Sequence, residues 1–363
     1  MKKLKVVTIL GTRPEIIRLS RLIALLDQET EHTVIHTGQN FDANLSDVFF
    51  SDLELRLPDI HLNADNSSLG TALGSIFREA ETALLEIAPD AVLILGDTNS
   101  ALVAIVVRRL GIPVFHMEAG NRSFDQRVPE ELNRRVVDHI SNFNLPYSEF
   151  ARENLLREGI HPNTICKTGS PMPEVLRHIN PRVEESKILQ TLGVSPSQYF
   201  LVSAHRQETV NNRGELTKLF GSMALLAQES GLPIVVSTHP RLKSMIAEHH
   251  VDIPANVILC EPFGYIDYLK LQKNANCVLS DSGTISEESS VLGFPAITIR
   301  DSFERQEASE TGSIILAGLD YAKWRRAIDA TLHSPAVSKP LDYQVTDFAA
   351  RVYKFMLSKV AVN

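Results

Sequence analysis

The sequence predicts an α/β protein with two domains, each built around a parallel β-sheet. First, 363 residues exceed what one ordinary hydrophobic core accommodates, so two domains are expected. Second, short β-branched runs alternate with longer amphipathic stretches, which is the pattern of βαβ units. Third, the runs VVTIL and AVLIL are apolar throughout or nearly so, as strands covered by helices on both faces require.

The order of the expected elements supports this prediction. Strands are expected at Lys5–Leu10, Thr33–His36, Ala91–Leu95, Pro113–Met117, Phe143–Pro146, Ile165–Thr168, Tyr199–Ala204, Ile234–Thr238, Val257–Cys260, Cys277–Ser280, Ala296–Ile299 and Ser313–Leu316. Helical periodicity between them predicts helices over Pro14–Asp27, Leu69–Ile87, Ser100–Leu110, Glu215–Glu229 and Thr284–Leu292. The alternation pauses at Ser170–Ser197, which is rich in Pro and Ser and weakly periodic. The domain junction is therefore expected just before this stretch, near Gly169.

Composition excludes several classes of protein. A hydrophobic content of 44% with 22% charged residues is typical of a soluble globular enzyme. The net charge of −8 argues against a nucleic-acid partner, which requires a basic face. No run of about twenty apolar residues exists, so no membrane span is expected. The N-terminal MKKLKVVTILGTRPE carries an apolar run of only about six residues, which favours a first strand over a signal peptide.

The three cysteines, Cys166, Cys260 and Cys277, are widely spaced and form no metal-binding pattern. Reduced thiols in the cytoplasm are the expected state. No HExxH or similar spacing of His, Cys, Asp or Glu appears, so no metal is predicted.

Ionisable residues follow most of the expected strands. The segments read GTRPE, TGQN, GDTN and EAG in the first half, and HRQE, HPR, DSGT and RD..ER in the second. Because doubly wound sheets bind ligands beyond the carboxyl ends of their strands, we expect a shared cleft between the two sheets.

The stretch DSGTISEE at Asp281–Glu288 is the sharpest local signal. A strand end, a Ser-Gly-Thr turn and a helix start would present free N–H groups and a positive dipole end to a phosphate. Glu288, about one turn further on, could reach a ribose diol. The alternative is a capping box, in which Ser282 or Thr284 pairs with Glu287 or Glu288.

The stretch Gly11–Glu15 has a similar design, since Thr12 can cap a helix, Pro14 suits its first turn and Arg13 can bind an anion. The alternative is a well-made helix start with a surface arginine. The glycines lack the GxGxxG arrangement, so no nicotinamide cofactor is predicted.

Asp97, Glu118 and Glu130 are the candidates for proton transfer, because grouped carboxylates shift one another's proton affinity. The alternatives are a helix N-cap for Asp97 and a helical ion pair with Arg134 for Glu130. His205 and His239 also follow strands, although a core or capping role is the commoner fate of a single histidine.

Taken in order, these motifs resemble the non-hydrolysing UDP-N-acetylglucosamine 2-epimerase family. The matches are GTRPE, GDT, HMEAG followed by R…PEE.NR, AHR.E, STHP, SDSGTISEE and RD..ER.E, and they cover about 300 residues. The resemblance implies the GT-B architecture, with two Rossmann-like domains facing across a cleft. The domains would be residues 1–168 and 169–345, with a C-terminal helix in residues 346–363 crossing back to the first.

The resemblance also implies the reaction, which is epimerisation at C2 of a UDP-linked 2-acetamido sugar through a 2-acetamidoglycal. The enzyme would be dimeric and would need no cofactor. Catalytic roles carry over to Asp97, Glu118, Glu130 and His205. Contacts with UDP or the sugar carry over to Arg13, Arg18, Arg134, Phe263, Tyr268, Ser282, Gly283, Thr284, Glu288 and Arg305.

Several departures from the family pattern refine the substrate. The family commonly has Lys where this chain has Arg18, a second Gly where it has Thr284, and GN.. where it has Gly169-Ser-Pro-Met172. These variants resemble the subgroup that makes UDP-N-acetyl-L-fucosamine for surface polysaccharides from the 6-deoxy L-talo epimer. The ordinary glucosamine/mannosamine pair is the alternative substrate.

Two further classes of protein remain as alternatives. A GT-B glycosyltransferase would share the fold but would have little use for three carboxylates in the first domain. A catalytically inactive binder of nucleotide sugars would be expected to have lost Asp97, Glu118 or Glu130, and all three are present.

A regulatory site is also expected to differ. Many bacterial members of the family bind UDP-N-acetylglucosamine as an activator, using a pattern that resembles TGQHRE after the second strand. Here Thr37–Asp42 reads TGQNFD, with Asn40 and Phe41 in place of His and Arg. This difference predicts an enzyme that needs no such activator.

Overall fold

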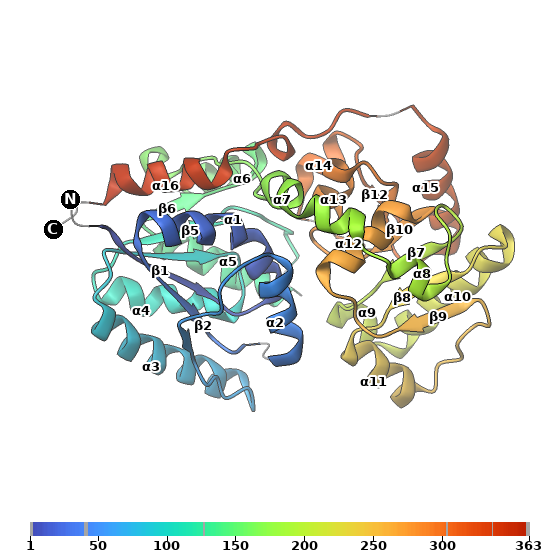
Figure 1. The fold of residues 1–363 in the computed structure, drawn as a ribbon, viewed down its shortest axis with the longest axis horizontal. Coiled ribbons are helices and arrows are strands. Elements are labelled where there is room, and N and C mark those ends of the chain that lie inside the picture. Colours follow the sequence, from blue (N-terminus) through green and yellow to red (C-terminus); the bar gives the residue numbers. More distant parts are fainter. Residues whose placement is uncertain (1–2, 40–42, 126–127, 303, 336, 361–363) are drawn as a thin grey trace. The chain divides into compact units, whose positions relative to one another are not determined.

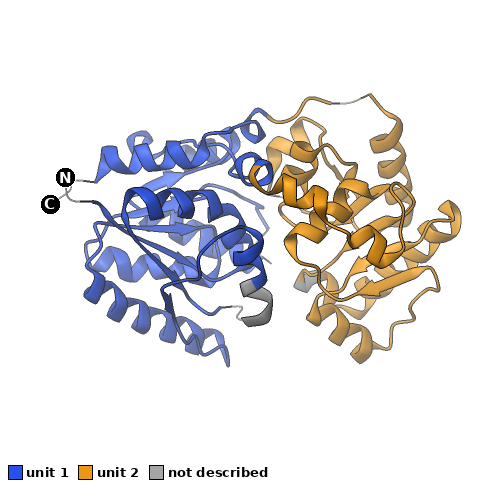
Figure 2. Ribbon diagram, in the orientation of Figure 1, with its two compact units in different colours: residues 1–177, 341–363 blue, residues 178–340 orange. Residues whose placement is uncertain are grey.

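A computed structural model describes residues 3–39, 43–125, 128–302, 304–335 and 337–360. It contains two compact units (Figure 2). Unit 1 comprises residues 1–177 and 341–363, and unit 2 comprises residues 178–340. The division lies inside helix α7 (Met172–Glu185), a short way beyond the expected junction near Gly169.

Unit 1 is built around a six-stranded sheet in the order β3-β2-β1-β4-β5-β6, and every strand pair is parallel (Figure 1). The strands are β1 (Lys5–Leu10), β2 (Glu31–His36), β3 (Ile60–His61), β4 (Ala91–Leu95), β5 (Val114–Met117) and β6 (Phe143–Leu145). The helices are α1 (Arg13–Glu29), α2 (Ala43–Asp52), α3 (Leu69–Ile87), α4 (Ala104–Arg109), α5 (Pro129–Ile140), α6 (Glu149–Arg157) and α16 (Phe348–Lys359), with short 3-10 turns at Asn99–Val103, Pro162–Thr164 and Leu341–Tyr343.

Unit 2 contains a second parallel sheet in the order β12-β11-β10-β7-β8-β9. Its strands are β7 (Phe200–Ser203), β8 (Ile234–Ser237), β9 (Val257–Cys260), β10 (Cys277–Ser280), β11 (Ala296–Thr298) and β12 (Ile315–Leu316). Its helices are α8 (Ile188–Leu192), α9 (Gln207–Val210), α10 (Arg213–Ser230), α11 (Pro240–His249), α12 (Tyr265–Asn274), α13 (Ile285–Leu292), α14 (Gln306–Glu310) and α15 (Tyr321–His333).

Both sheets have the same doubly wound strand order. The chain starts each sheet in the middle, builds outward to one side, and then crosses back to build the other side. The direction reverses between β1 and β4 in unit 1 and between β7 and β10 in unit 2. Ligands of such sheets bind beyond the strand ends at this reversal, so the loops after these four strands are the places to look for a site.

The sheets are buried as the apolar runs predicted. All five residues of β4 are buried, and the described part of each unit has its own hydrophobic core. Trp324 of α15 is fully buried in the core of unit 2, where its indole N–H donates to the carbonyl of Gly318 at 2.6 Å. The predicted α/β fold with two parallel sheets is therefore confirmed.

Three details differ from the prediction. Ile165–Thr168 forms no strand, because it contributes only an isolated bridge between Ile165 and Asn144. Strand β3 was not predicted, because a strand of two residues is too short to show a pattern in the sequence. The stretch Ser170–Ser197 is not weakly periodic, since it contains α7 and α8.

Helix α16 belongs to unit 1, where it packs against α1 (Figure 1). Its residues Phe348, Val352 and Met356 are buried, and the ring of Phe348 meets that of Tyr147 edge-on at 5.8 Å. The last segment of the chain therefore completes the core of the unit that the first segment begins.

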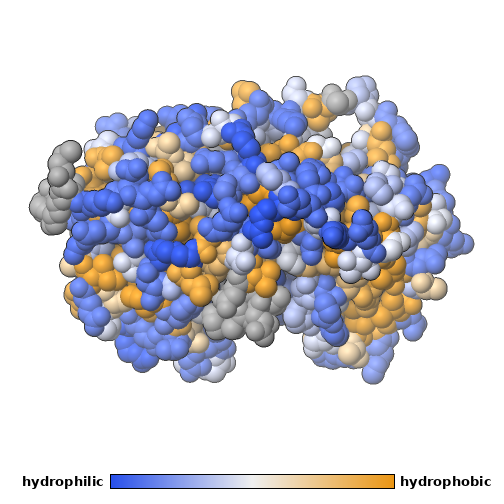
Figure 3. Space-filling model, in the orientation of Figure 1, coloured by the Kyte–Doolittle hydropathy of each residue, from blue (hydrophilic) through white to orange (hydrophobic). Residues whose placement is uncertain are grey.

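None of the helices in the described residues combines the length and the apolar character needed to cross a bilayer. The face shown in Figure 3 has hydrophilic and hydrophobic residues interspersed.

Candidate active site

The loops after β1 and β4 are joined by one buried carboxylate, that of Glu15. Its Oε2 accepts hydrogen bonds from Gly11 N at 2.8 Å and from Thr12 N and Oγ1 at 2.7 and 2.9 Å. Its Oε1 accepts from Thr98 Oγ1 at 2.9 Å. Burial raises the pKa of Glu15 to about 7, although these hydrogen bonds oppose the rise. Thr12 and Glu15 form the capping box of α1, so the helix start expected at GTRPE is present.

Gly11 lets three loops approach one another closely. A Cβ at this position would lie 2.1 Å from Thr37 Oγ1 and 2.2 Å from Ser100 Oγ. These two hydroxyls share a hydrogen bond of 2.6 Å, and Ser100 also donates through its N–H and its hydroxyl to Gln39. The loops after β1, β2 and β4 therefore form one packed layer. Arg13 stands at its edge, half-buried, with its guanidinium carbon 5.6 Å from the Phe49 ring.

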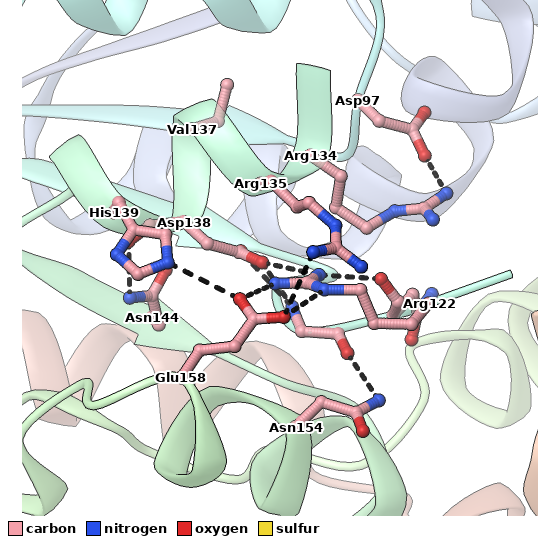
Figure 4. Close-up of polar contacts among 12 residues, drawn as sticks. Asp97, Arg122, Arg134, Arg135, Val137, Asp138, His139, Asn144, Asn154 and Glu158 are labelled. Atoms are coloured by element: carbon pink, nitrogen blue, oxygen red, sulfur yellow. Dashed lines mark hydrogen bonds and ion pairs between the residues drawn. The ribbon is translucent and has the colours of Figure 1, made fainter. Parts of the chain in front are cut away.

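Asp97 forms an ion pair with Arg134 of α5 (Figure 4). The Arg134 side chain is almost fully buried and also contacts Glu131 at 3.3 Å. The N-cap of the following 3-10 turn is Thr98, not Asp97, so the capping alternative for Asp97 is wrong. Asn133 Nδ2 donates to the carbonyl of Asp97 at 2.9 Å, which fixes the loop against α5.

Glu131, and not Glu130, forms the ion pair with Arg134 within α5. Its carboxylate is buried, contacts Arg134 and Arg135, and accepts from the N–H and hydroxyl of Ser123 at 2.9 and 3.1 Å. Glu130 is the second residue of α5 and is half-buried.

Glu118 directly follows β5 in a left-handed backbone conformation with φ of 61°. This conformation is unfavourable for a residue with a Cβ, and it recurs at functional sites. The carboxylate lies 3.3 Å from the buried Arg18 and accepts from Asn121 Nδ2 at 3.3 Å. The Arg18 guanidinium carbon lies 5.7 Å from the Tyr147 ring. Arg18, expected at the substrate, thus pairs with the Glu118 carboxylate.

Unit 1 therefore presents Asp97 and Glu118 at the ends of the adjacent strands β4 and β5, each paired with a buried arginine. The side chains of Asp97 and Glu118 are 19% and 15% exposed, and Oε2 of Glu118 is buried. Each arginine holds its carboxylate in place, and a group that transfers a proton must be held within hydrogen-bond reach of that proton.

In unit 2 the reversal between β7 and β10 carries a His–Asp pair. His205 Nδ1 lies 2.9 Å from Oδ1 of the buried Asp281, and the backbone N–H groups of residues 205 and 206 donate to Oδ2 at 2.8 and 2.9 Å. Burial alone would raise the pKa of Asp281, but the charge and hydrogen bonds from this loop bring it below its ordinary value. The His205 side chain is 43% exposed, so it is not a core histidine. His239, by contrast, caps α11 by accepting from Arg241 N at 3.3 Å.

The turn after β10 leads directly into α13. Ser282 Oγ lies 3.0 Å from Thr284 Oγ1, and it accepts from Thr284 N at 3.3 Å. The N-cap residue, Thr284, makes no capping hydrogen bond with its side chain. Ser282, Gly283 and Thr284 are all partly exposed. The turn before α13 is therefore partly exposed, and the anion site expected there stays a prediction.

Glu288 is buried in the first turn of α13. Its carboxylate accepts from Tyr265 Oη at 3.2 Å and from Gln272 Nε2 at 2.8 Å. Burial raises the pKa of Glu288, against the effect of these hydrogen bonds. Its fixed position comes from α12, which sequence reasoning did not connect with α13.

The remaining predicted residues of unit 2 lie beside α13, in the loop before α12, or in α12 itself. Arg305 is buried and lies 3.4 Å from Glu287 of α13. Phe263 is half-buried in the loop between β9 and α12. Burial raises the pKa of Tyr268, whose hydroxyl is enclosed beside Ser203 and Ser280 at the ends of β7 and β10.

Within the described residues, no cluster of three or more His, Cys, Asp or Glu side chains could hold a metal ion.

Comparison with known proteins identifies the family. The sequence profile of the family described as UDP-N-acetylglucosamine 2-epimerase matches residues 24–357. The chain belongs to the UDP-N-acetylglucosamine 2-epimerase family. As a member of this epimerase family it is an enzyme, a non-hydrolysing isomerase.

Two curated relatives illustrate the range of the epimerase family. UDP-N-acetylglucosamine 2-epimerase of Methanocaldococcus jannaschii is 37% identical over 339 residues, which cover 91% of this chain and 93% of the relative. UDP-2,3-diacetamido-2,3-dideoxy-D-glucuronate 2-epimerase of Pseudomonas aeruginosa is 32% identical over 321 residues, which cover 87% of this chain and 88% of the relative.

Solved structures of epimerases share the fold. The UDP-N-acetylglucosamine 2-epimerase of Rickettsia bellii is 39% identical, with a TM-score of 0.91 and coverage of 98% of this chain and 97% of that one. The M. jannaschii enzyme in complex with UDP-GlcNAc and UDP is 34% identical, with a TM-score of 0.91 and coverage of 98% and 100%. The expected GT-B-like fold with two Rossmann-like domains is confirmed.

Proposed function

We propose that the protein interconverts the C2 epimers of a UDP-linked 2-acetamido sugar. A carboxylate removes the C2 proton while UDP leaves C1 with the electrons of the C1–O bond, which gives a 2-acetamidoglycal. UDP then adds back to C1 as a proton is delivered to the other face of C2. The observation that carries the proposal is the pair of partly exposed carboxylates, Asp97 and Glu118, each beside a buried arginine on adjacent strand ends.

The proposed roles divide between the units. In unit 1, Asp97, Glu118 and Glu130 would transfer protons, with Arg134 and Arg18 fixing two of the carboxylates. In unit 2, the start of α13, His205 and Arg305 would hold the diphosphate. In unit 1, Arg13 would offer its guanidinium to an anion. Glu288 would bind the ribose hydroxyls and the segment Phe263–Tyr268 the uracil. A helix N-terminus with free N–H groups is a general binding place for phosphate.

We propose UDP-2-acetamido-2,6-dideoxy-L-talose as the substrate and UDP-N-acetyl-L-fucosamine, a precursor of surface polysaccharide, as the product. The support is the set of sequence departures at Arg18, Thr284 and Gly169-Ser-Pro-Met172. UDP-N-acetylglucosamine is the second candidate, because it is named for relatives as similar as the M. jannaschii enzyme. Initial rates with each nucleotide sugar, measured at equal enzyme concentration, decide between them.

Solvent deuterium should enter the product at C2. Removing and replacing the C2 proton exposes it to water, and breaking the C1–O bond frees the β-phosphate to rotate. In deuterated water, NMR of the product should show deuterium at C2, and positional isotope exchange should scramble the bridging oxygen of UDP. Product that carries no solvent deuterium would contradict the glycal mechanism while leaving the family assignment intact.

The kinetics should be hyperbolic and independent of UDP-N-acetylglucosamine. The stretch TGQNFD lacks the arginine of the resembling TGQHRE pattern, and its residues Asn40, Phe41 and Asp42 lie outside the described part of the chain. A lost charge-assisted contact weakens binding by about 1.5–3 kcal/mol, or roughly ten- to hundredfold. Rates with the L-talo substrate should follow a simple saturation curve with or without UDP-N-acetylglucosamine. Sigmoidal rate curves that become hyperbolic when UDP-N-acetylglucosamine is added would overturn the prediction. They would favour the glucosamine/mannosamine pair as substrate.

We propose that the enzyme works in the cytoplasm as a homodimer. Family resemblance supports the dimer. The free thiols of the widely spaced Cys166, Cys260 and Cys277 support the cytoplasm, a reducing compartment. Analytical ultracentrifugation of the purified protein should give the mass of a dimer. A monomer mass at micromolar concentration would exclude the homodimer.

A further inference from the structure

Unit 1 groups four ionisable side chains, three of them completely buried, next to the loops of Asp97 and Glu118. We call this group the inner cluster, and it consists of His116, Arg122, Asp138 and Glu158. The side chains of His116, Arg122 and Asp138 are completely buried, and that of Glu158 is 24% exposed. Figure 4 shows Arg122 between the carboxylates of Asp138 and Glu158. Such a group costs free energy to bury unless every charge is paired.

Arg122 makes the strongest set of contacts in the inner cluster. Its Nε and Nη2 donate to the two Glu158 oxygens at 2.9 and 2.6 Å, a bidentate arrangement. Its Nη1 lies 2.8 Å from Asp138 Oδ2. The hydrogen bond from Arg122 holds the pKa of Glu158 below its usual range. Arg122 therefore bridges the two carboxylates, of which Asp138 is the completely buried one.

The two nitrogens of His116 both face acceptors. Nε2 lies 2.8 Å from the carbonyl oxygen of Gly96, which can only accept, so Nε2 carries a proton. Nδ1 lies 3.0 Å from Asp138 Oδ1. Because both Asp138 oxygens already accept, from Gly120 N at 3.2 Å and Arg122, the side chain is an ionised acceptor. Burial alone would raise the pKa of Asp138, but His116 and Arg122 together bring it below its ordinary value.

A second proton, on Nδ1, would let His116 also interact favourably with the ionised Asp138, whose Oδ1 lies 3.0 Å away. This imidazolium and Arg122 would together compensate Asp138, whereas Glu158 also lies 4.0 Å from Arg135 and 3.4 Å from His139. A neutral imidazole would instead direct a lone pair at the Asp138 carboxylate inside a buried region, where repulsion is poorly screened.

His116 connects the two loops that carry the carboxylates. Its Nε2–H holds the carbonyl of Gly96, the residue directly before Asp97. Through Asp138 it holds the N–H of Gly120, two residues after Glu118. Glu118 and Gly120 have φ values of 61° and 81°, a backbone that such anchoring helps to maintain. Asn154 Nδ2 completes the attachment by donating to the carbonyl of Gly120 at 3.0 Å.

We propose that His116 is a positively charged positioning residue that holds the loops of Asp97 and Glu118 at a fixed separation. Its link to catalysis rests on the proposed epimerase function. It does not touch the substrate, since it is completely buried, and it acts through Gly96 and Asp138.

The charge of His116 can be measured without any assay of activity. In protein labelled with ¹⁵N-histidine at pH 7.5, an imidazolium gives two similar ring-nitrogen shifts, whereas a neutral ring gives one far-downfield, pyridine-like shift. The signal is assigned with the His116→Gln variant. We expect the imidazolium pattern for His116. A pyridine-like nitrogen in the wild-type protein would overturn the proposal, whatever reaction the enzyme catalyses.

If His116 positions the two loops, its replacement should lower the turnover rate without weakening UDP binding. His116→Gln keeps a donor near the Nε2 position but loses the charge and the link to Asp138, so kcat should fall tenfold or more. UDP affinity, measured by calorimetry, should change less than twofold, because the residues proposed to bind UDP lie mainly in unit 2.

His139→Gln is the matched control, since His139 lies 3.4 Å from Glu158 but is 48% exposed, and it should retain wild-type kcat. A folded His116→Gln enzyme with unchanged kcat would refute the positioning role. A wild-type enzyme that epimerises none of the UDP-sugars would refute the proposed function instead.

Discussion

Glu118→Gln and Asp97→Asn should each lower kcat by about a hundredfold or more, the range expected when a group that transfers a proton is removed. Each amide has nearly the shape of the carboxylate it replaces but cannot take up or release the proton. Turnover is measured by NMR of the two epimers at saturating substrate. Calorimetry should show that UDP still binds with an affinity near that of the wild-type protein.

Two controls make this result specific. Glu288→Gln should produce the opposite pattern, with weaker UDP binding, because Glu288 lies in the first turn of α13 in unit 2. Thermal unfolding of Glu118→Gln is needed as well, because the substitution leaves the buried Arg18 beside a neutral amide. Near-normal turnover in folded Glu118→Gln would show that the acid–base assignment is wrong.

Gly120→Ala should destabilise the protein by roughly 2–5 kcal/mol. The added Cβ would lie 2.2 Å from the carbonyl oxygen of Ala151 and 2.8 Å from Leu155 Cγ, and the backbone of α6 cannot move aside easily. The φ of 81° adds a penalty of about 1–2 kcal/mol for a residue with a Cβ, and overpacking adds about 1–3 kcal/mol. Denaturant unfolding of the purified variant measures the loss.

Gly159→Ala separates these two contributions. Gly159 has a similar φ of 87°, but a Cβ there would meet no atom within 4 Å. It should therefore lose only the conformational part, about 1–2 kcal/mol. Equal losses for the two variants would mean that the contact with Ala151 is unimportant.

Much of the architecture follows from simple features of the sequence. Helix α3 spans Leu69–Ile87, as its period predicted, and β4 was recognisable because all five of its residues are apolar. The carboxyl ends of parallel strands lie along one edge of the sheet. That Asp97 and Glu118 lie near each other was therefore predictable from their positions directly after two strands.

The failures have physical reasons too. The apolar positions Val175, Leu176, Ile179 and Val183 of α7 are all buried at helical spacing, but Pro181 lies inside the helix and gave the stretch the composition of a linker. In the same way, the sequence places Glu130 and Glu131 side by side and gives no sign that only Glu131 turns inward to Ser123 and Arg134.

Other misses concern contacts between distant segments. Glu15 and Thr98 are far apart in the chain, as are His116 and Asp138, and their hydrogen bonds exist only once the loops pack together. A pattern of residue types along the chain contains no signal for such a contact. The position of Glu15 three residues after Thr12 is a signal for a capping box. It gives no sign of the hydrogen bond from Thr98.

The packing of α16 on α1 has a consequence for how the protein is made. During translation all six strands of unit 1 emerge from the ribosome long before residues 341–363, which supply Phe348, Val352 and Met356 to its core. Unit 2 is one continuous segment and has all its residues once position 340 is synthesised. The second unit in the sequence can therefore finish folding before the first. Until then the nascent chain keeps an uncovered apolar surface on α1, which is the kind of surface that chaperones bind.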